Sequence, residues 1–256
     1  MIAKGSMLRT NPWLISFEYS ERASLRLFCF PYAGGGALVY RDWHRFLPES
    51  IGVYAAQFPG RGDRLSEPPL RDLPALIEPL TEAIKPYLDK PFAFFGHSMG
   101  ALIAFELARK LRSEYAIEPV HLFVSGRRAP QLADSDCVTY NLEETEFIEE
   151  LRRLNGTPRE MLENPELMGL MVPMLRADFQ VCQTYVYTES PPLRCPITVF
   201  GGLKDNDVTR EYLQPWRDQT SVSFTLRLLP GDHFFLHSSE ATLLRMIAQE
   251  LNQLIT

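Results

Sequence analysis

Phe92-Ala-Phe-Phe-Gly-His-Ser-Met-Gly-Ala101 is the stretch of this sequence that decides the fold. Its first four residues are apolar, as in a buried strand, and a helical pattern follows from Ala101 to Leu111. Between them, Gly96-His-Ser-Met-Gly100 fits the Gly-x-Ser-x-Gly pattern of a nucleophile elbow. The glycines are needed because the chain reverses sharply, so that a Cβ at either one would collide with neighbouring backbone. The pattern alone is weak, but its place between a strand and a helix makes Ser98 the predicted nucleophile.

Five other short runs, rich in apolar, β-branched and aromatic residues, predict further strands. The last of them precedes an amphipathic helix that we expect over about 239–254. Apolar strands that alternate with helices are typical of a parallel sheet covered on both faces. We therefore expect an α/β protein with a mostly parallel central sheet and helices on both faces. The five runs are Leu25–Phe30, Val53–Phe58, Val120–Val124, Ile197–Phe200 and Ser223–Leu229.

The segment at about 134–191 breaks this alternation. It contains no convincing strand, but it has helical patterns over Glu143–Leu154 and Pro165–Tyr185. An all-helical insertion between two strands is most simply a lid over the strand ends, where open α/β sheets bind their ligands. We expect one domain, 1–256, that carries this lid.

Composition and charge exclude several classes of protein. Hydrophobic residues make up 45% of the 256-residue chain and charged residues 23%, which is ordinary for one globular domain. A net charge of -6 without a local run of Lys or Arg argues against nucleic-acid binding. The sequence has neither a signal-peptide core nor the roughly 18 apolar residues of a membrane span, so we expect a cytoplasmic protein. Four well-separated cysteines predict reduced thiols rather than disulfides or a metal site, namely Cys29, Cys137, Cys182 and Cys195.

Two histidines follow the last predicted strand, where enzymes with such an elbow place their general base. His233 lies directly after the strand, in the tight turn of Leu229-Pro-Gly-Asp-His-Phe-Phe235. His237 lies four residues later, where a surface or capping histidine is expected. We therefore predict that His233 is the base. The His-x-x-x-His spacing also resembles half of a zinc site, but no third ligand stands nearby, so we expect no metal.

Two aspartates compete for the role of the acid, which should close the strand before the base. Asp205 lies in the loop at the end of the strand that begins at Ile197, where its carboxylate could fix the tautomer of the imidazole. Asp207 could as easily start the following helix. The sequence favours Asp205 and leaves Asp207 open.

A serine acyl enzyme also needs two backbone N–H groups at the point where the tetrahedral oxygen forms. One should come from Met99, directly after the nucleophile, and the other from the loop Phe30-Pro-Tyr-Ala-Gly-Gly-Gly36. The glycines permit a close approach of the backbone, and Ala33 is the natural donor. The alternative is that this loop is simply a flexible turn.

Several segments, in the same order along the chain, resemble the type II thioesterases that accompany nonribosomal peptide and polyketide synthases, within the α/β-hydrolase superfamily. The resemblance implies that Ser98, Asp205 and His233 form a triad, that the two donors above form the oxyanion hole, and that the helical insertion is the substrate lid. The matching segments are Phe30–Gly35, Gln57–Arg64, Phe95–Ala101, Leu154–Pro158, Pro173–Phe179 and Leu229–Phe235.

The same resemblance implies the reaction and the partner. Such an enzyme hydrolyses acyl or aminoacyl thioesters on the phosphopantetheine arm of carrier proteins, through an acyl-enzyme, and so clears blocked or mis-primed carriers. The phosphopantetheine belongs to the substrate, so no metal or redox cofactor is expected. We expect a stand-alone monomer whose partners are the acyl or peptidyl carrier domains of a synthase.

Two sets of residues are candidates for recognition. Lid methionines could line an adaptable acyl channel, although methionines more often pack helices together. They are Met161, Met168, Met171 and Met174. Arginines in loops on the predicted active face could meet an acidic carrier, although surface arginines are usually only solvated. They are Arg61, Arg64, Arg127 and Arg128.

Three other functions remain open at this point. A carboxylesterase or lipase would use the same triad on oxygen esters, although Tyr32-Ala-Gly-Gly35 differs from the His-Gly-Gly-Gly that is usual in lipases. An acyltransferase would pass the acyl group to a nucleophile other than water. A catalytically silent binding protein of the same fold would be expected to lack part of the triad or of the oxyanion loop.

Overall fold

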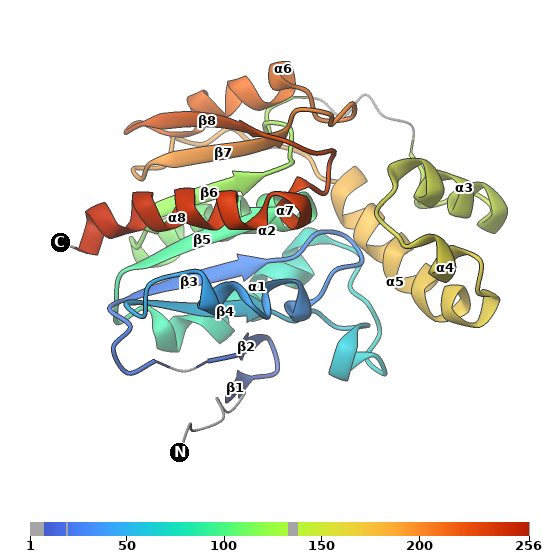
Figure 1. Ribbon diagram of the computed structural model, residues 1–256, viewed down its shortest axis with the longest axis horizontal. Helices are drawn as coiled ribbons and strands as arrows, with labels where there is room; N and C mark the ends of the chain where they lie inside the picture. Colours follow the sequence, from blue (N-terminus) through green and yellow to red (C-terminus); the bar gives the residue numbers. More distant parts are fainter. Residues whose placement is uncertain (1–7, 19, 133–137, 256) are drawn as a thin grey trace.

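The computed structural model describes residues 8–18, 20–132 and 138–255 around a central eight-stranded sheet (Figure 1). Its strands are β1 (Leu8–Asn11), β2 (Leu14–Ser16), β3 (Leu25–Phe30), β4 (Ile51–Ala56), β5 (Phe92–His97), β6 (His121–Ser125), β7 (Ile197–Gly202) and β8 (Phe224–Leu229). They lie in the order β1-β2-β4-β3-β5-β6-β7-β8. The six strands from β3 to β8 are mutually parallel, whereas β1 and β2 form an antiparallel edge. The predicted mostly parallel sheet is confirmed.

All six predicted strands are present, and β3 has the predicted bounds. The antiparallel edge was not predicted. Its strands have only four and three residues, and β2 pairs with β4 through Leu14↔Ala56 and Ile15↔Ala55. Such short segments carry almost no periodicity, so only backbone pairing defines them, of β2 with β4 and of β1 with β2.

Helices cover both faces of the sheet. The α-helices of the described residues are α1 (Leu73–Ile84), α2 (Met99–Tyr115), α3 (Glu144–Leu154), α4 (Arg159–Leu162), α5 (Pro165–Gln183), α6 (Arg210–Leu213), α7 (Phe235–Ser238) and α8 (Glu240–Ile255), of which α3, α4 and α5 lie beyond the ends of the strands. Figure 1 shows α8 in front of the sheet and α1 and α2 behind it. Across residues 8–18, 20–132 and 138–255, none of the helices combines the length and the hydropathy that a membrane crossing requires.

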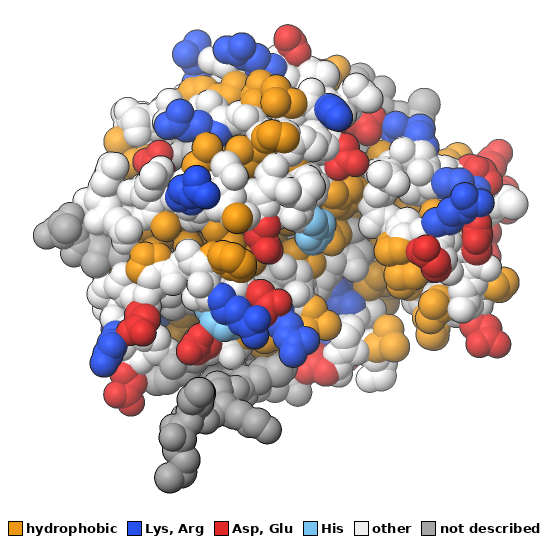
Figure 2. All heavy atoms as spheres, viewed as in Figure 1, with side chains coloured by type: hydrophobic (Ala, Val, Ile, Leu, Met, Phe, Trp, Pro, Cys, Tyr) orange, Lys and Arg blue, Asp and Glu red, His pale blue; other side chains and the backbone are white. Residues whose placement is uncertain are grey.

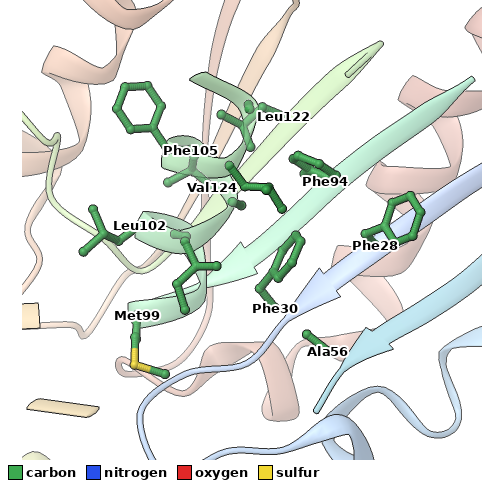
Figure 3. Close-up of a cluster of buried hydrophobic side chains, with 14 of the residues drawn as sticks. Phe28, Phe30, Ala56, Phe94, Met99, Leu102, Phe105, Leu122 and Val124 are labelled. Atoms are coloured by element: carbon green, nitrogen blue, oxygen red, sulfur yellow. The ribbon is translucent and has the colours of Figure 1, made fainter. Parts of the chain in front are cut away.

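Two cores lie on the two faces, and the alternation of side chains along β3 divides them. Phe28 and Phe30 point toward α1 and α2, whereas Leu25, Leu27 and Cys29 point toward α8. Figure 3 shows part of the first core, with Phe28 and Phe30 near side chains of β5 and α2. Each large apolar side chain contributes about 1.5–3 kcal/mol when it is fully buried. Because both faces are buried, the strands appear in the sequence as continuous apolar runs.

Helices α3, α4 and α5 form the insertion between β6 and β7. The insertion lies beyond the carboxyl ends of the parallel strands (Figure 1). It has a small core of its own, around Phe147, Leu151 and Leu175. Helices α3 and α5 confirm the two predicted helices within two residues at each end, whereas the four-residue α4 was not predicted. Residues 133–137, where the insertion was predicted to begin, lie outside the described part of the chain.

Candidate active site

Ser98 sits at the turn between β5 and α2, with φ 53° and ψ −114°. This strained conformation persists because the chain around it is closely packed. A Cβ on Gly96 would lie 2.1 Å from the carbonyl oxygen of Gly100, and a Cβ on Gly100 would lie 1.9 Å from that of Phe30. Neither position can accept a side chain, which confirms the predicted strand–turn–helix geometry of the elbow.

The close approach of Gly100 to Phe30 also brings the loop after β3 beside the nucleophile. Ala33, in that loop, lines the same cavity as Ser98. Met99 is the first residue of α2, where backbone N–H groups have no acceptor within the helix and the helix dipole favours negative charge. Ala33 therefore shares a cavity with Ser98, Met99 follows Ser98 directly at the start of α2, and both stay predicted oxyanion donors.

His233 and Asp205 form a hydrogen-bonded pair. The His233 Nδ1 atom lies 2.7 Å from Asp205 Oδ2, and the Asp205 side chain is only 1% exposed. The other carboxylate oxygen, Oδ1, accepts the backbone N–H groups of Asp207 (3.0 Å) and Val208 (2.9 Å). The acid is therefore fixed by the loop that carries it, and it fixes the imidazole in turn.

Asp207 has another role in the structure. The helix after it, α6, begins at Arg210 with Thr209 at its N-terminus, so Asp207 does not start that helix as the sequence had suggested. Its carboxylate instead accepts a hydrogen bond from Arg153 Nη1 of α3 at 2.9 Å. Among the described residues, His233 bonds to Asp205 and not to Asp207, which favours Asp205 as the candidate acid.

A second histidine, His97, lies behind the pair. It is fully buried, its Nδ1 atom lies 2.8 Å from Ser125 Oγ, and its ring centroid lies 5.2 Å from that of His233. Burial, with a smaller contribution from the nearby His233, holds the pKa of His97 well below its usual value. His97 is therefore neutral near pH 7, and it adds no positive charge that would weaken the base. His237 is exposed, as predicted, and its Nε2 atom lies 3.0 Å from Tyr32 Oη.

A cavity of about 660 Å³ joins these groups to the insertion. Figure 2 shows the surface hollowed between the insertion and the rest of the molecule, with hydrophobic side chains and a histidine at its border. Ser98, His233 and Ala33 line one side of the cavity. The apolar side chains that line it from the insertion are Leu142, Leu151, Leu154, Leu175, Phe179 and Cys182. Polar residues of the insertion line the cavity as well, namely Thr139, Glu150, Arg153, Thr157 and Gln183, so Ser98 shares it with apolar and polar side chains.

The four lid methionines are not among the residues that line this cavity. Met168 and Met174 are buried in the core of the insertion, and Met171 packs against that core. Met161 is half-buried on α4. The packing alternative considered for these methionines therefore fits the structure better than the channel. Sequence patterns could not separate the two, because both place methionines on a helix face.

The expectation that four arginines are available to a partner is wrong for three of them, because Arg61, Arg64 and Arg128 are 5–7% exposed. Arg64 pairs with Glu67 and stacks over Trp13, with its Cζ atom 4.4 Å from the ring centroid. The third buried arginine, Arg128, stacks over an aromatic ring in the same way. Of the four, Arg127 alone lines the cavity. Arginines in loops look exposed in a sequence until their tertiary partners are known.

Within the described ranges, His, Cys, Asp and Glu form no group of three or more that could hold a metal ion. Cys29 and Cys195 are free thiols, and Cys137 lies outside those ranges. Burial raises the pKa of Cys29 well above its usual value and that of Cys195 to about 12, so these two thiols are poor nucleophiles.

Comparison with known proteins gives a consistent result. A family model described as "Thioesterase domain" matches residues 25–251. Gramicidin S biosynthesis protein GrsT of Aneurinibacillus migulanus is 47% identical over 243 residues, which cover 95% of each chain. Linear gramicidin dehydrogenase LgrE of Brevibacillus parabrevis is 49% identical over 242 residues, which cover 93% of this chain and 92% of LgrE. The name of LgrE denotes a different reaction, so the family assignment depends on the match to the family model.

Solved structures support the same assignment. BorB, a type II thioesterase from the borrelidin biosynthetic cluster, superimposes with a TM-score of 0.88 at 35% identity, over 95% of this chain and 99% of BorB. This similarity confirms the predicted α/β-hydrolase fold.

Proposed function

The chain belongs to the thioesterase domain family, and from that premise we propose that it hydrolyses acyl or aminoacyl thioesters on the carrier proteins of a nonribosomal peptide or polyketide synthase. One observation carries the proposal: Ser98 on its strained elbow and His233, which is hydrogen-bonded to Asp205, line one cavity together with apolar side chains of the insertion. The relatives named for gramicidin S and borrelidin biosynthesis support this class of substrate.

The first half of the reaction forms an acyl-enzyme. Ser98 Oγ attacks the thioester carbonyl carbon while His233 Nε2 takes its proton, and Asp205 stabilises the resulting imidazolium through the Nδ1–H. The backbone N–H groups of Ala33 and Met99 hold the negative oxygen of the tetrahedral intermediate. When the intermediate collapses, the C–S bond breaks, and the phosphopantetheine sulfur leaves as a thiol with the proton that His233 returns.

The second half releases the acid. A water molecule takes the place of the thiol and gives a proton to His233 Nε2 as its oxygen attacks the acyl carbon. The same two N–H groups hold the second tetrahedral oxygen. His233 then protonates Ser98 Oγ, the ester bond breaks, and the free acid leaves. Thus one base serves both halves, and the protein requires no cofactor of its own.

The insertion acts as the lid of this site. Its leucines and Phe179 form the wall that an acyl chain would contact, and a cavity of about 660 Å³ suits a small to medium acyl group. Because α3 and α5 border the cavity that holds Ser98, the insertion also limits the access of water. We treat 134–191 as this lid within a single domain, and we expect a cytoplasmic monomer whose partners are carrier proteins.

The decisive experiment uses a carrier protein loaded with an acetyl group on its phosphopantetheine arm. Release of acetate that disappears in Ser98→Ala would support both the reaction and the nucleophile. Cleavage of a simple oxygen ester with no release from the carrier would favour an esterase, and transfer of acetyl to an added amine or thiol would favour an acyltransferase. A fluorophosphonate that fails to label Ser98 would favour a silent binding protein.

A further inference from the structure

A buried carboxylate of the insertion reaches the loop that follows β3. Asp178 of α5 accepts the backbone N–H of Gly34 through Oδ2 at 2.7 Å. Arg61 Nη1 donates to the same oxygen and Arg61 Nη2 to Oδ1, each at 2.7 Å. The two side chains are 6% (Arg61) and 2% (Asp178) exposed. This is a bidentate pair with little access to water, so its geometry is tightly held.

Arg61 extends the contact to the next peptide of the loop. Its Nη1 atom also donates to the carbonyl oxygen of Gly35 at 2.9 Å. The ion pair therefore holds the N–H of Gly34 on one side and the C=O of Gly35 on the other. These groups belong to the two residues that follow Ala33, the donor assigned above to the oxyanion hole. The Gly34 N–H belongs to the peptide unit that joins Ala33 to Gly34. A hydrogen bond that holds this peptide unit in place therefore limits the backbone orientations open to Ala33.

Helix α5 touches the same loop with a second residue. A Cβ on Gly34 would lie 2.7 Å from Leu175 Cδ2, so the helix packs directly against this glycine, whose φ is +81°. Leu175 and Asp178 are three residues apart and lie on one face of α5. Leu175 also lines the cavity. One face of the insertion helix therefore contacts both the acyl cavity and the oxyanion loop.

We propose that Asp178 is a positioning residue, which fixes the conformation of the oxyanion loop through its bonds to Gly34 and Arg61. The rate of the chemical step then depends on the position of α5 relative to this loop. This inference rests on the proposed function, because it concerns an oxyanion that forms in that reaction. Oxyanion donors act only when they lie about 2.7–3.1 Å from the oxygen of the tetrahedral intermediate. Without the bond to Asp178, the loop no longer holds its N–H at that distance. The transition state is then destabilised more than the binding of the substrate is weakened.

The competing role for this pair is stability of the fold alone. Removing one partner would leave a buried, unpaired charge and could unfold the protein. The test therefore replaces both, as Arg61→Met/Asp178→Leu, because exchanging a whole buried pair for apolar residues is often neutral for stability. A matched control makes the same exchange at the exposed pair of α4, as Arg159→Met/Glu163→Leu, where the side chains are 84% and 56% exposed. Both proteins are checked for folding by urea denaturation.

The expected result is a split between kcat and KM. In Arg61→Met/Asp178→Leu we expect kcat to fall at least about tenfold while KM changes less than about threefold, and we expect the control pair to change neither. The single variant Asp178→Asn keeps an acceptor for the Gly34 N–H but loses the charge that attracts Arg61. Its kcat should therefore lie between that of the wild type and that of the double variant. An unchanged kcat in the folded double variant, or a rise in KM alone, overturns the proposal. If the double variant does not fold, an unchanged kcat in Asp178→Asn overturns it instead.

A second readout does not depend on the substrate. A fluorophosphonate phosphonylates Ser98, and its phosphoryl oxygen occupies the oxyanion hole, so the rate of labelling should fall in parallel with kcat. If the wild type fails to hydrolyse the loaded carrier but labelling still slows in the variants, the proposed substrate is wrong and the positioning role stands. If the wild type hydrolyses the carrier and labelling is equal in all variants, the positioning role is wrong.

Discussion

The Nδ1 atom of His233 lies 2.7 Å from Oδ2 of Asp205, while Oδ1 of the same carboxylate accepts two backbone N–H groups of its own loop. The carboxylate therefore cannot rotate without losing three hydrogen bonds at once. This arrangement assigns separate tasks to its two oxygens, one for the loop and one for the imidazole. It also separates Asp205 from Asp207, whose carboxylate bonds to Arg153.

Asp205→Asn should lower kcat by about 10⁴-fold, because the amide favours the wrong tautomer of His233. The matched control is Asp207→Asn, which disturbs an ion pair whose side chains are 54% (Arg153) and 43% (Asp207) exposed. We expect the control to change kcat less than about threefold, since exposed pairs contribute little. Steady-state hydrolysis of the loaded carrier measures both, and equal losses in the two variants would contradict the assignment of the acid.

Gly100→Ala should destabilise the protein by about 3 kcal/mol or more, or prevent folding, because the new Cβ would meet the backbone oxygen of Phe30 at 1.9 Å. The control is Gly169→Ala on α5, where no atom lies within 4 Å of the added Cβ. That change should stabilise by about 0.5–1 kcal/mol, since alanine is the better helix former. Urea denaturation compares them, and a Gly100→Ala protein as stable as the wild type would refute the elbow geometry.

Phe179→Ala should shift the preference for acyl length. Phe179 lines the cavity from α5, so its loss leaves room for a longer chain opposite Ser98. We expect kcat/KM for an octanoyl carrier to rise about tenfold relative to an acetyl carrier, because a few buried methylenes are worth about 1–3 kcal/mol. Met171→Ala, outside the cavity lining, should leave this ratio unchanged. If this ratio changed in Met171→Ala but not in Phe179→Ala, the methionines rather than Phe179 would contact the acyl chain.

The pH dependence of stability should depend on His121, whose Nε2 atom lies 2.9 Å from Thr198 Oγ1. Burial lowers its pKa from 6.5 to about 4. Between these values the unfolded chain binds a proton that the folded protein does not, so the free energy of unfolding falls as the pH falls from about 6.5 toward 4. The loss from this residue is roughly 3 kcal/mol over that window. In His121→Gln, the free energy of unfolding measured by urea denaturation should change less between pH 7 and pH 4.5. If it changes as much as in the wild type, His121 is not the cause of the pH dependence.

Much of the fold could be predicted because its determinants are local. The central strands β4, β5, β6 and β7 are buried along their whole length, so they appear as largely apolar runs, and β3 has the bounds that its six residues predicted. The helices α3 and α5 appear through their own periodicity. The edge strands β1 and β2 could not be found in this way, because they are short and are defined by pairing alone, of β2 with β4 and of β1 with β2. The four-residue α4 is likewise too short for a periodic signal.

The sequence by itself determined the strand–turn–helix of the elbow around Ser98 and predicted His233 as the base, since both follow from residue types at fixed distances from a strand. Only the tertiary structure decided between Asp205 and Asp207, because two carboxylates in one loop differ only in which partner each one reaches. The same holds for Arg61 and Asp178, which are 117 residues apart and meet only when the insertion packs on the loop after β3. Side-chain partners across such separations depend on the packing of distant elements, which no local pattern of residues encodes.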